Sequence, residues 1–195
     1  MNGAELDNVT VELLIAVAQL ALGVAGFSGI AMYFKRKPGP LTNIEVYRIA
    51  ILFFNAFAAV FLALAPFPLD AFGFSGPSVW RIGSAIMATF EIAFHWYYLP
   101  RSQRYLRQVP ELFNRYSLIL TYTGGLGNLL LQLANAFGLA GQRHAAIFMM
   151  GTLWLLFHAT FQFGRILFVQ PTEKTMRADP EHALAIAGET SSVDS

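Results

Sequence analysis

Apolar residues run along this chain in five long blocks, and most of its charges and prolines fall between these blocks or after the last one. Each block exceeds the ~20 residues that an α-helix needs to cross the hydrocarbon core of a membrane. The pattern therefore predicts an all-α integral membrane bundle of five transmembrane helices within residues 1–168. The predicted spans are residues 9–34, 43–69, 79–99, 117–139 and 144–168. A polar segment, residues 169–195, follows and is predicted to be a disordered tail.

The composition agrees with a chain whose surroundings are largely lipid, because 55% of its 195 residues are hydrophobic and only 13% are charged. Basic residues do not form a block with interleaved aromatic residues, so nucleic acid is not an expected partner. Cysteine is absent from the sequence, which excludes disulfides, thiolate metal sites, iron–sulfur clusters and covalently attached haem. The expected partner is the lipid bilayer, together with further copies in a homo-oligomer or another subunit of a membrane complex.

The Lys and Arg residues are unevenly shared between the two sides that five spans create. Of the 13, only Arg81 and Arg143 fall on the first side, and the other eleven fall on the second. Those eleven are Lys35, Arg36, Lys37, Arg48, Arg101, Arg104, Arg107, Arg115, Arg165, Lys174 and Arg177. Because positive residues are retained in the cytoplasm, we predict an outside N-terminus and a cytoplasmic C-terminus. Residues 100–116 are predicted to lie on the inner surface as an amphipathic stretch.

The first span combines small residues with one short motif. Small residues recur at every fourth position in its second half, a spacing that lets neighbouring helices approach closely in lipid. Residues 24–30, VAGFSGI, resemble a motif of small bacterial multi-pass membrane proteins of an uncharacterised family. This resemblance implies location in a plasma membrane, the bacterial inner membrane, and it implies no activity. Near the outer end of this span, Glu12 is predicted to pair with Arg81 at the start of the third span.

A polar layer crosses the interior of the predicted bundle. Glu91 and His95 lie one helical turn apart on the third span, so they share one face. At about 1.5 Å per residue, polar residues of three other spans fall at similar depths. The predicted polar site comprises Glu91, His95, His158, Gln162, Asn55 and Asn128. A carboxylate at this depth costs about 2.5–3.5 kcal/mol in insertion measurements, so we expect Glu91 to face the bundle interior and His158. An asparagine, Asn55 or Asn128, is expected at the same level.

The fourth span extends this layer along one of its faces. Gly124, Asn128 and Gln132 recur every four residues and Asn135 follows three residues later, so they form a polar stripe on one side of a helix. The glycines of this span do not form a phosphate-binding loop, because no strand precedes them and no Lys-Ser/Thr pair follows them.

Four interpretations of the polar layer stay open. It is a hydrogen-bonded cluster that fixes helix packing, or it is a path for protons, ions or a small ligand. In a third interpretation Glu91, His95 and His158 are the three protein ligands of a metal ion. In a fourth, His95 and His158 hold a haem b. Only the last two need a cofactor, and we expect none otherwise.

Several activities are excluded by the distribution of lysine and histidine. Every lysine lies outside the predicted spans, so no retinal Schiff base forms inside the bundle. Two of the four histidines, His144 and His182, lie at or beyond the membrane edge, which leaves too few for a His-box oxygenase. No Ser-His-Asp arrangement is evident. The sequence therefore favours a non-enzymatic membrane protein that handles protons, ions or a small ligand, or alternatively a non-catalytic assembly or scaffold subunit.

Overall fold

The computed structural model describes residues 8–35, 43–108 and 115–168. The secondary structure of this described part is entirely helical, without a strand, which confirms the all-α prediction there. The helices are α1 (Asn8–Lys35), α2 (Asn43–Leu64), α3 (Pro66–Ala71), α4 (Pro77–Gln108), α5 (Arg115–Ala136) and α6 (His144–Phe168). Residues 169–195 lie outside the described residues, so the polar tail stays a prediction.

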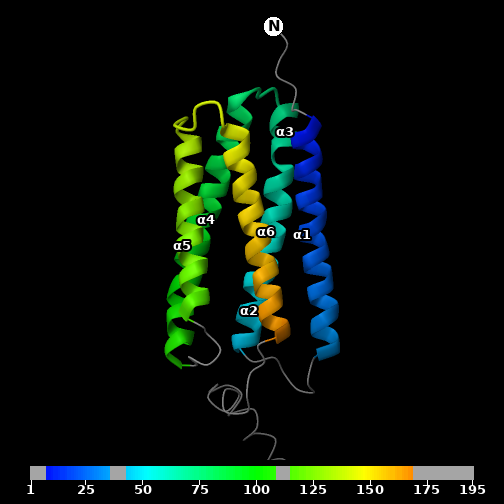
Figure 1. Ribbon diagram of the computed structural model, residues 1–195, viewed down its shortest axis with the longest axis vertical. Helices are drawn as coiled ribbons and strands as arrows, with labels where there is room; N and C mark the ends of the chain where they lie inside the picture. Colours follow the sequence, from blue (N-terminus) through cyan, green and yellow to red (C-terminus); the bar gives the residue numbers. More distant parts are fainter. Residues whose placement is uncertain (1–7, 36–42, 109–114, 169–195) are drawn as a thin grey trace, which may run out of the picture.

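Five long helices stand side by side, and α6 lies at the centre of the bundle (Figure 1). This helix contacts α1, α2, α4 and α5, whereas α1 contacts only α2 and α6 among the described helices. Successive long helices run in opposite directions, with α4 and α5 on one side of the bundle and α1 on the other. Because α6 touches every other long helix, its side chains meet groups from both halves of the bundle.

Three helical segments are long and apolar enough to cross a membrane, namely Asn8–Phe34, Asn43–Ala71 and His144–Phe168. The other two long helices, α4 with 32 residues and α5 with 22, carry more polar residues. Large apolar side chains cover the outward surface, including Phe61 with 71% exposure and Phe27 with 67%. Helices that contact lipid carry such a surface, whereas a water-soluble protein seldom exposes so much apolar area. These features are those of a membrane protein.

The predicted span over residues 43–69 lies within the membrane-length segment Asn43–Ala71, and this segment is divided near its far end. The helix α2 ends at Leu64, and a separate short helix, α3, begins at Pro66. Proline lacks the N–H group that continues the helical ladder, and its ring clashes with the carbonyl group one turn earlier. Proline is well suited to the first turn of a helix, where its N–H would be unpaired in any case.

The helix that carries the third predicted span does not stop at residue 99, where a separate surface stretch was expected, and residues 109–114 of that stretch lie outside the described residues. The helix α4 continues through Pro100 as far as Gln108. Tyr105 and Leu106, beyond the proline, pack against a buried cluster that includes Tyr47 of α2. These tertiary contacts stabilise the last turns of α4, and they outweigh the backbone hydrogen bond that Pro100 removes.

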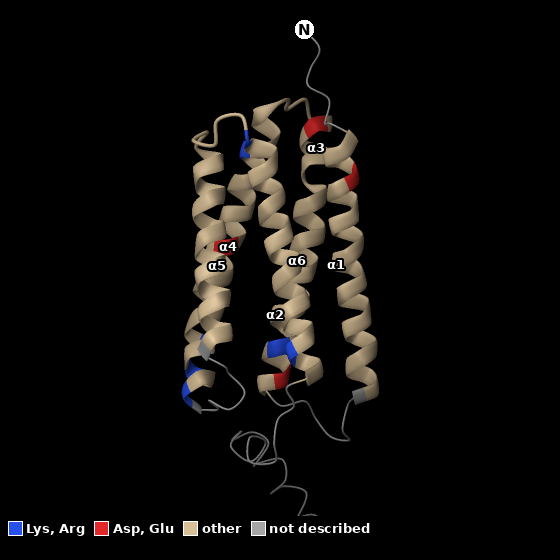
Figure 2. Ribbon diagram, viewed as in Figure 1, with Lys and Arg blue, Asp and Glu red and all other residues tan. Residues whose placement is uncertain are grey.

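Charged segments gather at the two ends of the bundle, and the middle is nearly free of them (Figure 2). One end is formed by α3 and the turns beside it, and we refer to it as the α3 end. The opposite end, here named the Arg-rich end, carries Arg48, Arg101, Arg104, Arg107 and Arg165.

The predicted ion pair between Glu12 and Arg81 is wrong. The helices that carry these residues, α1 and α4, do not contact each other. Arg81 instead donates a hydrogen bond from Nε to the carbonyl oxygen of Ala136 at the end of α5, over 3.2 Å. Cations interact favourably with the last carbonyl groups of a helix. Glu12 and Arg81 were predicted to lie at a similar depth, but a similar depth does not make two helices neighbours in the bundle.

Close packing of α5 against α6 at Gly124 leads to a first prediction. A Cβ atom at Gly124 would overlap the ring of Trp154 on α6, whereas a Cβ atom at Gly127 would meet nothing within 4 Å. We expect Gly124→Ala to be destabilising by about 1–3 kcal/mol relative to Gly127→Ala, because the added methyl group overpacks the interface. Both substitutions add the same group to α5, so thermal unfolding in detergent compares them directly. Equal melting temperatures would contradict the close contact.

Candidate functional site

Glu91 is the acidic residue at the centre of the candidate site. It lies on α4 with only 2% of its surface exposed. Its Oε1 atom accepts a hydrogen bond from Asn128 Nδ2 of α5 at 2.9 Å. Its Oε2 atom lies 3.3 Å from His95 Nδ1, one turn further along α4. Both carboxyl oxygens therefore have partners, as burial of this group requires.

The proton on His95 can be assigned from its surroundings. His95 Nδ1 lies 2.7 Å from the backbone carbonyl oxygen of Glu91, which only accepts hydrogen bonds. Nδ1 therefore carries a proton. The other nitrogen, Nε2, is buried without a hydrogen-bond partner among the described residues. It lies against Gly125 of α5, where a Cβ atom would come within 2.6 Å of it. The glycine thus makes room for the imidazole.

Hydrogen bonds continue from Asn128 toward the α3 end. Gln132 Nε2 donates to Asn128 Oδ1 at 3.2 Å, and Gln132 Oε1 accepts from Ser84 Oγ at 2.8 Å. Asn135 Nδ2 donates to Ser84 Oγ at 2.7 Å, and Asn135 Oδ1 lies 2.7 Å from His144 Nδ1. These bonds join α4, α5 and α6 into one network. We name it the polar chain, and its members in order are His144, Asn135, Ser84, Gln132, Asn128, Glu91 and His95.

The sequence pattern found part of this chain. The spacing of Asn128, Gln132 and Asn135 correctly places these three amides on one face of α5, and they are buried. Four members were not among the predicted site residues: Gln132 and Asn135 were noted only as part of the polar stripe, and Ser84 and His144 were not assigned to the layer. Ser84 lies two turns before Glu91 on the same face of α4, which is a weak signal, because serine is common inside membrane helices.

His158 and Asn55 form a second polar group between α6 and α2. Asn55 donates from Nδ2 to the carbonyl oxygen of Ile51 at 2.8 Å, so its Oδ1 atom is left to accept. His158 Nδ1 lies 3.2 Å from this Oδ1. Its Nε2 atom lies 3.1 Å from Gln162 Nε2, and Gln162 Oε1 accepts from Arg165 at 3.3 Å. Each nitrogen of the buried His158 ring therefore has a partner.

The prediction that Glu91 faces His158 is wrong, because the single predicted layer is divided into two groups. Asn128 is the partner of Glu91, and Asn55 is the partner of His158. The ring of Phe94 lies edge-on to both imidazoles, with centroid distances of 5.7 Å to His95 and 5.9 Å to His158. An aromatic side chain thus occupies the space where the two polar groups were expected to meet.

The geometry does not support either cofactor interpretation. Among the described residues, no three His, Asp or Glu side chains lie close enough together to hold a metal ion, so Glu91, His95 and His158 do not form the predicted ligand set. A haem ligated by His95 and His158 needs a free nitrogen on each ring. Both nitrogens of His158 are engaged in hydrogen bonds.

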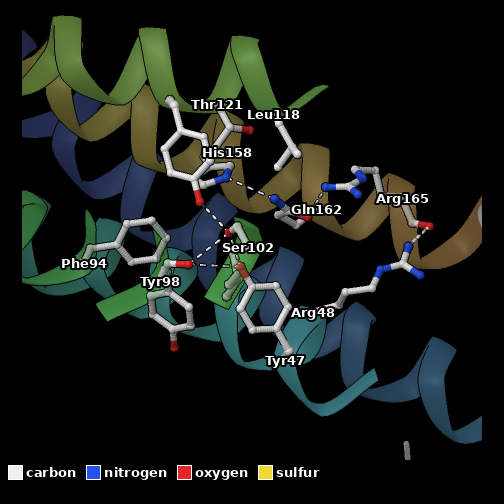
Figure 3. A pocket seen from close by; sticks show the side chains of 12 residues that line it. Tyr47, Arg48, Phe94, Tyr98, Ser102, Leu118, Thr121, His158, Gln162 and Arg165 are labelled. Atoms are coloured by element: carbon white, nitrogen blue, oxygen red, sulfur yellow. Dashed lines mark hydrogen bonds between the residues drawn. The ribbon is translucent and has the colours of Figure 1, made fainter. Parts of the chain in front are cut away.

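A small cavity lies on the Arg-rich side of this second group (Figure 3). Its volume is ≈ 20 Å³, which is enough for a water molecule. Ser102 lies in it and donates to the carbonyl oxygen of Tyr98 at 3.0 Å, while its Oγ atom accepts from the hydroxyl groups of Tyr47 and Tyr122. His158 also lines the cavity. Hydroxyl groups and an imidazole therefore surround a space that a water can occupy.

Two arginines lie at the edge of the same cavity, on α2 and α6. Arg48 is buried and donates from Nη2 to the backbone carbonyl oxygen of Arg165, in the last turn of α6. A cation in this position satisfies a carbonyl group that the end of the helix leaves unpaired. In the sequence, the only sign of this cavity is Arg48, a cation inside the apolar block 43–69, and it contributed only to the predicted topology.

The chemistry of the two halves differs. The polar chain between His144 and Glu91 consists of amides and one serine, and an amide does not take up and pass on a proton as a carboxyl, imidazole or hydroxyl group does. On the other side, the His95 ring lies 5.9 Å from that of Tyr122, which borders the cavity. Amide groups thus pair Glu91 on the α3 side, and the hydroxyl-bearing side chain of Tyr122 lies beside His95 on the Arg-rich side.

No protein-family model matches the chain, and neither a curated protein nor a solved structure is similar to it. The resemblance of residues 24–30 to a bacterial membrane motif therefore stays a prediction. The assignment of a function depends on the geometry of the polar chain and the cavity.

Removal of one hydroxyl group tests the polar chain. Ser84→Ala leaves Asn135 Nδ2 and Gln132 Oε1 without a shared partner in a buried region, and we expect a loss of about 1–3 kcal/mol in stability. Thr89→Val is the matched control, since Thr89 is exposed on the same helix and bonds only to its own backbone at Ala85. We expect the control to stay within about 0.5 kcal/mol of wild type. Chemical or thermal unfolding in detergent measures both, and equal stability would contradict the network.

Proposed function

We propose that this chain is a five-span integral membrane protein of a bacterial inner membrane in which Glu91 and His95 bind and release a proton. The observation that carries the proposal is the carboxyl group of Glu91, buried between membrane-length helices and paired with both Asn128 and His95. Ionisable residues inside membrane helices are costly and usually have a function in proton or ion movement.

Support for five spans comes from the outward faces of α4 and α5. Ile86 and Ile92 are exposed on α4, and Leu126 and Leu130 are exposed on α5. Helices with apolar outward faces are stable against lipid even when their inward faces are polar. Among the polar residues that lower the mean hydropathy of α5, the three amides are buried and face inward, which agrees with a span inside a bundle.

Orientation in the proposal follows from the eleven-to-two distribution of Lys and Arg, with the N-terminus outside and the Arg-rich end in the cytoplasm. Reporter fusions after residue 4 and after residue 190 test it. We expect an external signal from the first fusion and a cytoplasmic signal from the second. A cytoplasmic signal from the N-terminal fusion would refute the topology, and signals on the same side would refute an odd number of spans.

Proton exchange is proposed to occur from the Arg-rich side. Tyr122 and Ser102 form a hydroxyl pair near His95, and the cavity beside them has room for water. Water and hydroxyl groups pass protons readily, and a modest movement of the Tyr122 ring would connect them to His95. The amides toward the α3 end hold Glu91 in place, so a net flux across the membrane requires a rearrangement that opens this side in turn.

A second function, that of a non-catalytic assembly or scaffold subunit, is favoured by the hydrogen bonding within the polar chain. Glu91, Asn128 and Gln132 each have hydrogen-bond partners from a neighbouring helix or turn. Buried groups paired in this way can serve only to fix helix positions and make the fold unique. The two functions differ in whether the proton on Glu91 exchanges.

Two substitutions at Glu91 separate these functions. Glu91→Gln keeps the size of the side chain and a hydrogen-bonding oxygen but cannot exchange a proton at neutral pH, so we expect it to abolish proton flux in proteoliposomes with little change in melting temperature. Glu91→Leu leaves Asn128 unpaired, so we expect a loss of flux and of about 1–3 kcal/mol in stability. Glu12→Gln is the control, because it removes an exposed carboxylate on α1, a helix that contacts neither α4 nor α5.

The outcomes are measured with a pH-sensitive dye inside the vesicles and by thermal unfolding of each variant. Wild-type flux that persists in Glu91→Gln would contradict proton binding at Glu91. Absence of wild-type flux, together with a stability loss in Glu91→Leu alone, would favour the assembly subunit.

A further inference from the structure

One side of α1 is uncovered in the described bundle. This helix contacts α2 and α6 and lies at the margin of the helix array (Figure 1). Ala16, Gln19, Gly23 and Gly26 are spaced three or four residues apart, so they share one face of α1. Ala16, Gln19 and Gly26 are exposed, and a Cβ atom at Gly23 or Gly26 would meet nothing within 4 Å. The outward face is therefore flat along its middle turns.

Gln19 is the polar group on this face. It lies about 16 Å from the first residue of α1, close to the middle of a hydrocarbon core of about 30 Å. It is exposed and forms no hydrogen bond with any residue that the structure describes. An amide without a partner in an apolar phase costs several kcal/mol, and lipid chains offer neither a donor nor an acceptor. A protein partner is the remaining way to satisfy it.

The hydrogen-bonding groups of the Gln19 carboxamide indicate which protein partner can satisfy it. An amide carries both an acceptor oxygen and donor hydrogens, so two copies of Gln19 related by a two-fold axis can bond reciprocally. Gly23 and Gly26, one and two turns further along, let two helix backbones approach closely, as small residues do in membrane helix pairs. Glu12 shares the face but lies near the start of α1, where water reaches it.

We infer that the protein forms a symmetric homodimer in the membrane through α1, with Gln19 of each copy bonded to Gln19 of the other across the axis. This interface does not involve Glu91 or the cavity, so it is independent of the proposed proton exchange. Two amide bonds between helices contribute enough in lipid to change the association constant about tenfold.

Because the chain contains no cysteine, single introduced cysteines report the interface without a background. Gly23→Cys places a thiol near the axis, where two copies can form a disulfide only if their Cα atoms lie within about 7 Å. Phe61→Cys is the matched control on α2, a helix outside the interface, at a position with 71% exposure. We expect oxidation in native membranes to cross-link the Gly23→Cys variant to a species of twice the chain mass and to leave the Phe61→Cys variant monomeric.

The role of Gln19 is tested by the degree of association in lipid, counted by single-molecule photobleaching. We expect Gln19→Leu to weaken dimerisation about tenfold, and Gln19→Asn, which keeps the amide, to weaken it less. The melting temperature in detergent should be unchanged, since Gln19 is exposed and forms no hydrogen bond with the described residues of its own copy.

Three results would overturn the α1 dimer, and a fourth would overturn its amide pair. The first is a monomeric wild type with no cross-link at position 23, and the second is equal cross-linking at positions 23 and 61. The third is a cross-link from position 23 to a different protein, which would assign the face to another subunit. Unchanged association in Gln19→Leu would refute the amide pair.

Discussion

A carboxyl group buried among membrane helices needs hydrogen-bond partners from the protein, because lipid supplies none. Glu91 obtains them from Asn128 on α5 and from His95 on its own helix. Asn128 in turn needs Gln132, and Gln132 needs Ser84 and a backbone carbonyl group of α6. The hydrogen bonds that pair Glu91 thus continue through Asn128 and Gln132, and they fix α4, α5 and α6 relative to one another.

The second half of the bundle satisfies its polar groups independently, through Asn55, His158 and Gln162 between α2 and α6. Phe94 separates the two groups, so a change in the protonation of Glu91 is not passed directly to His158 by a hydrogen bond. The small cavity beside His158 and the hydroxyl groups around Ser102 provide room for water and proton-exchanging groups on the Arg-rich side, whereas the α3 side consists mainly of amides. This asymmetry is the structural basis for proposing that protons reach Glu91 from one side.

Helical periodicity predicted where the long helices lie and which residues share a face, as the alignment of Asn128, Gln132 and Asn135 shows. It did not predict how the helices are arranged around α6, so His158 was assigned to Glu91 rather than to Asn55. The effect of proline on the helices was equally hard to predict. Pro66 begins a new helix, whereas α4 continues through Pro100, and only tertiary packing distinguishes the two positions. Rotation and helix neighbours depend on contacts between distant segments, which a pattern in one segment does not contain.

The central position of α6 has a consequence for biosynthesis, since this helix is synthesised after the other described helices. Until it enters the bundle, Asn55 has no imidazole to bond, and Gln132 lacks the carbonyl group of Ile147. The nascent chain must therefore keep the polar faces of its earlier helices together, or shield them with a chaperone or insertase, while α6 is synthesised. Premature termination before residue 144 would leave these faces exposed and mark the product for membrane proteolysis.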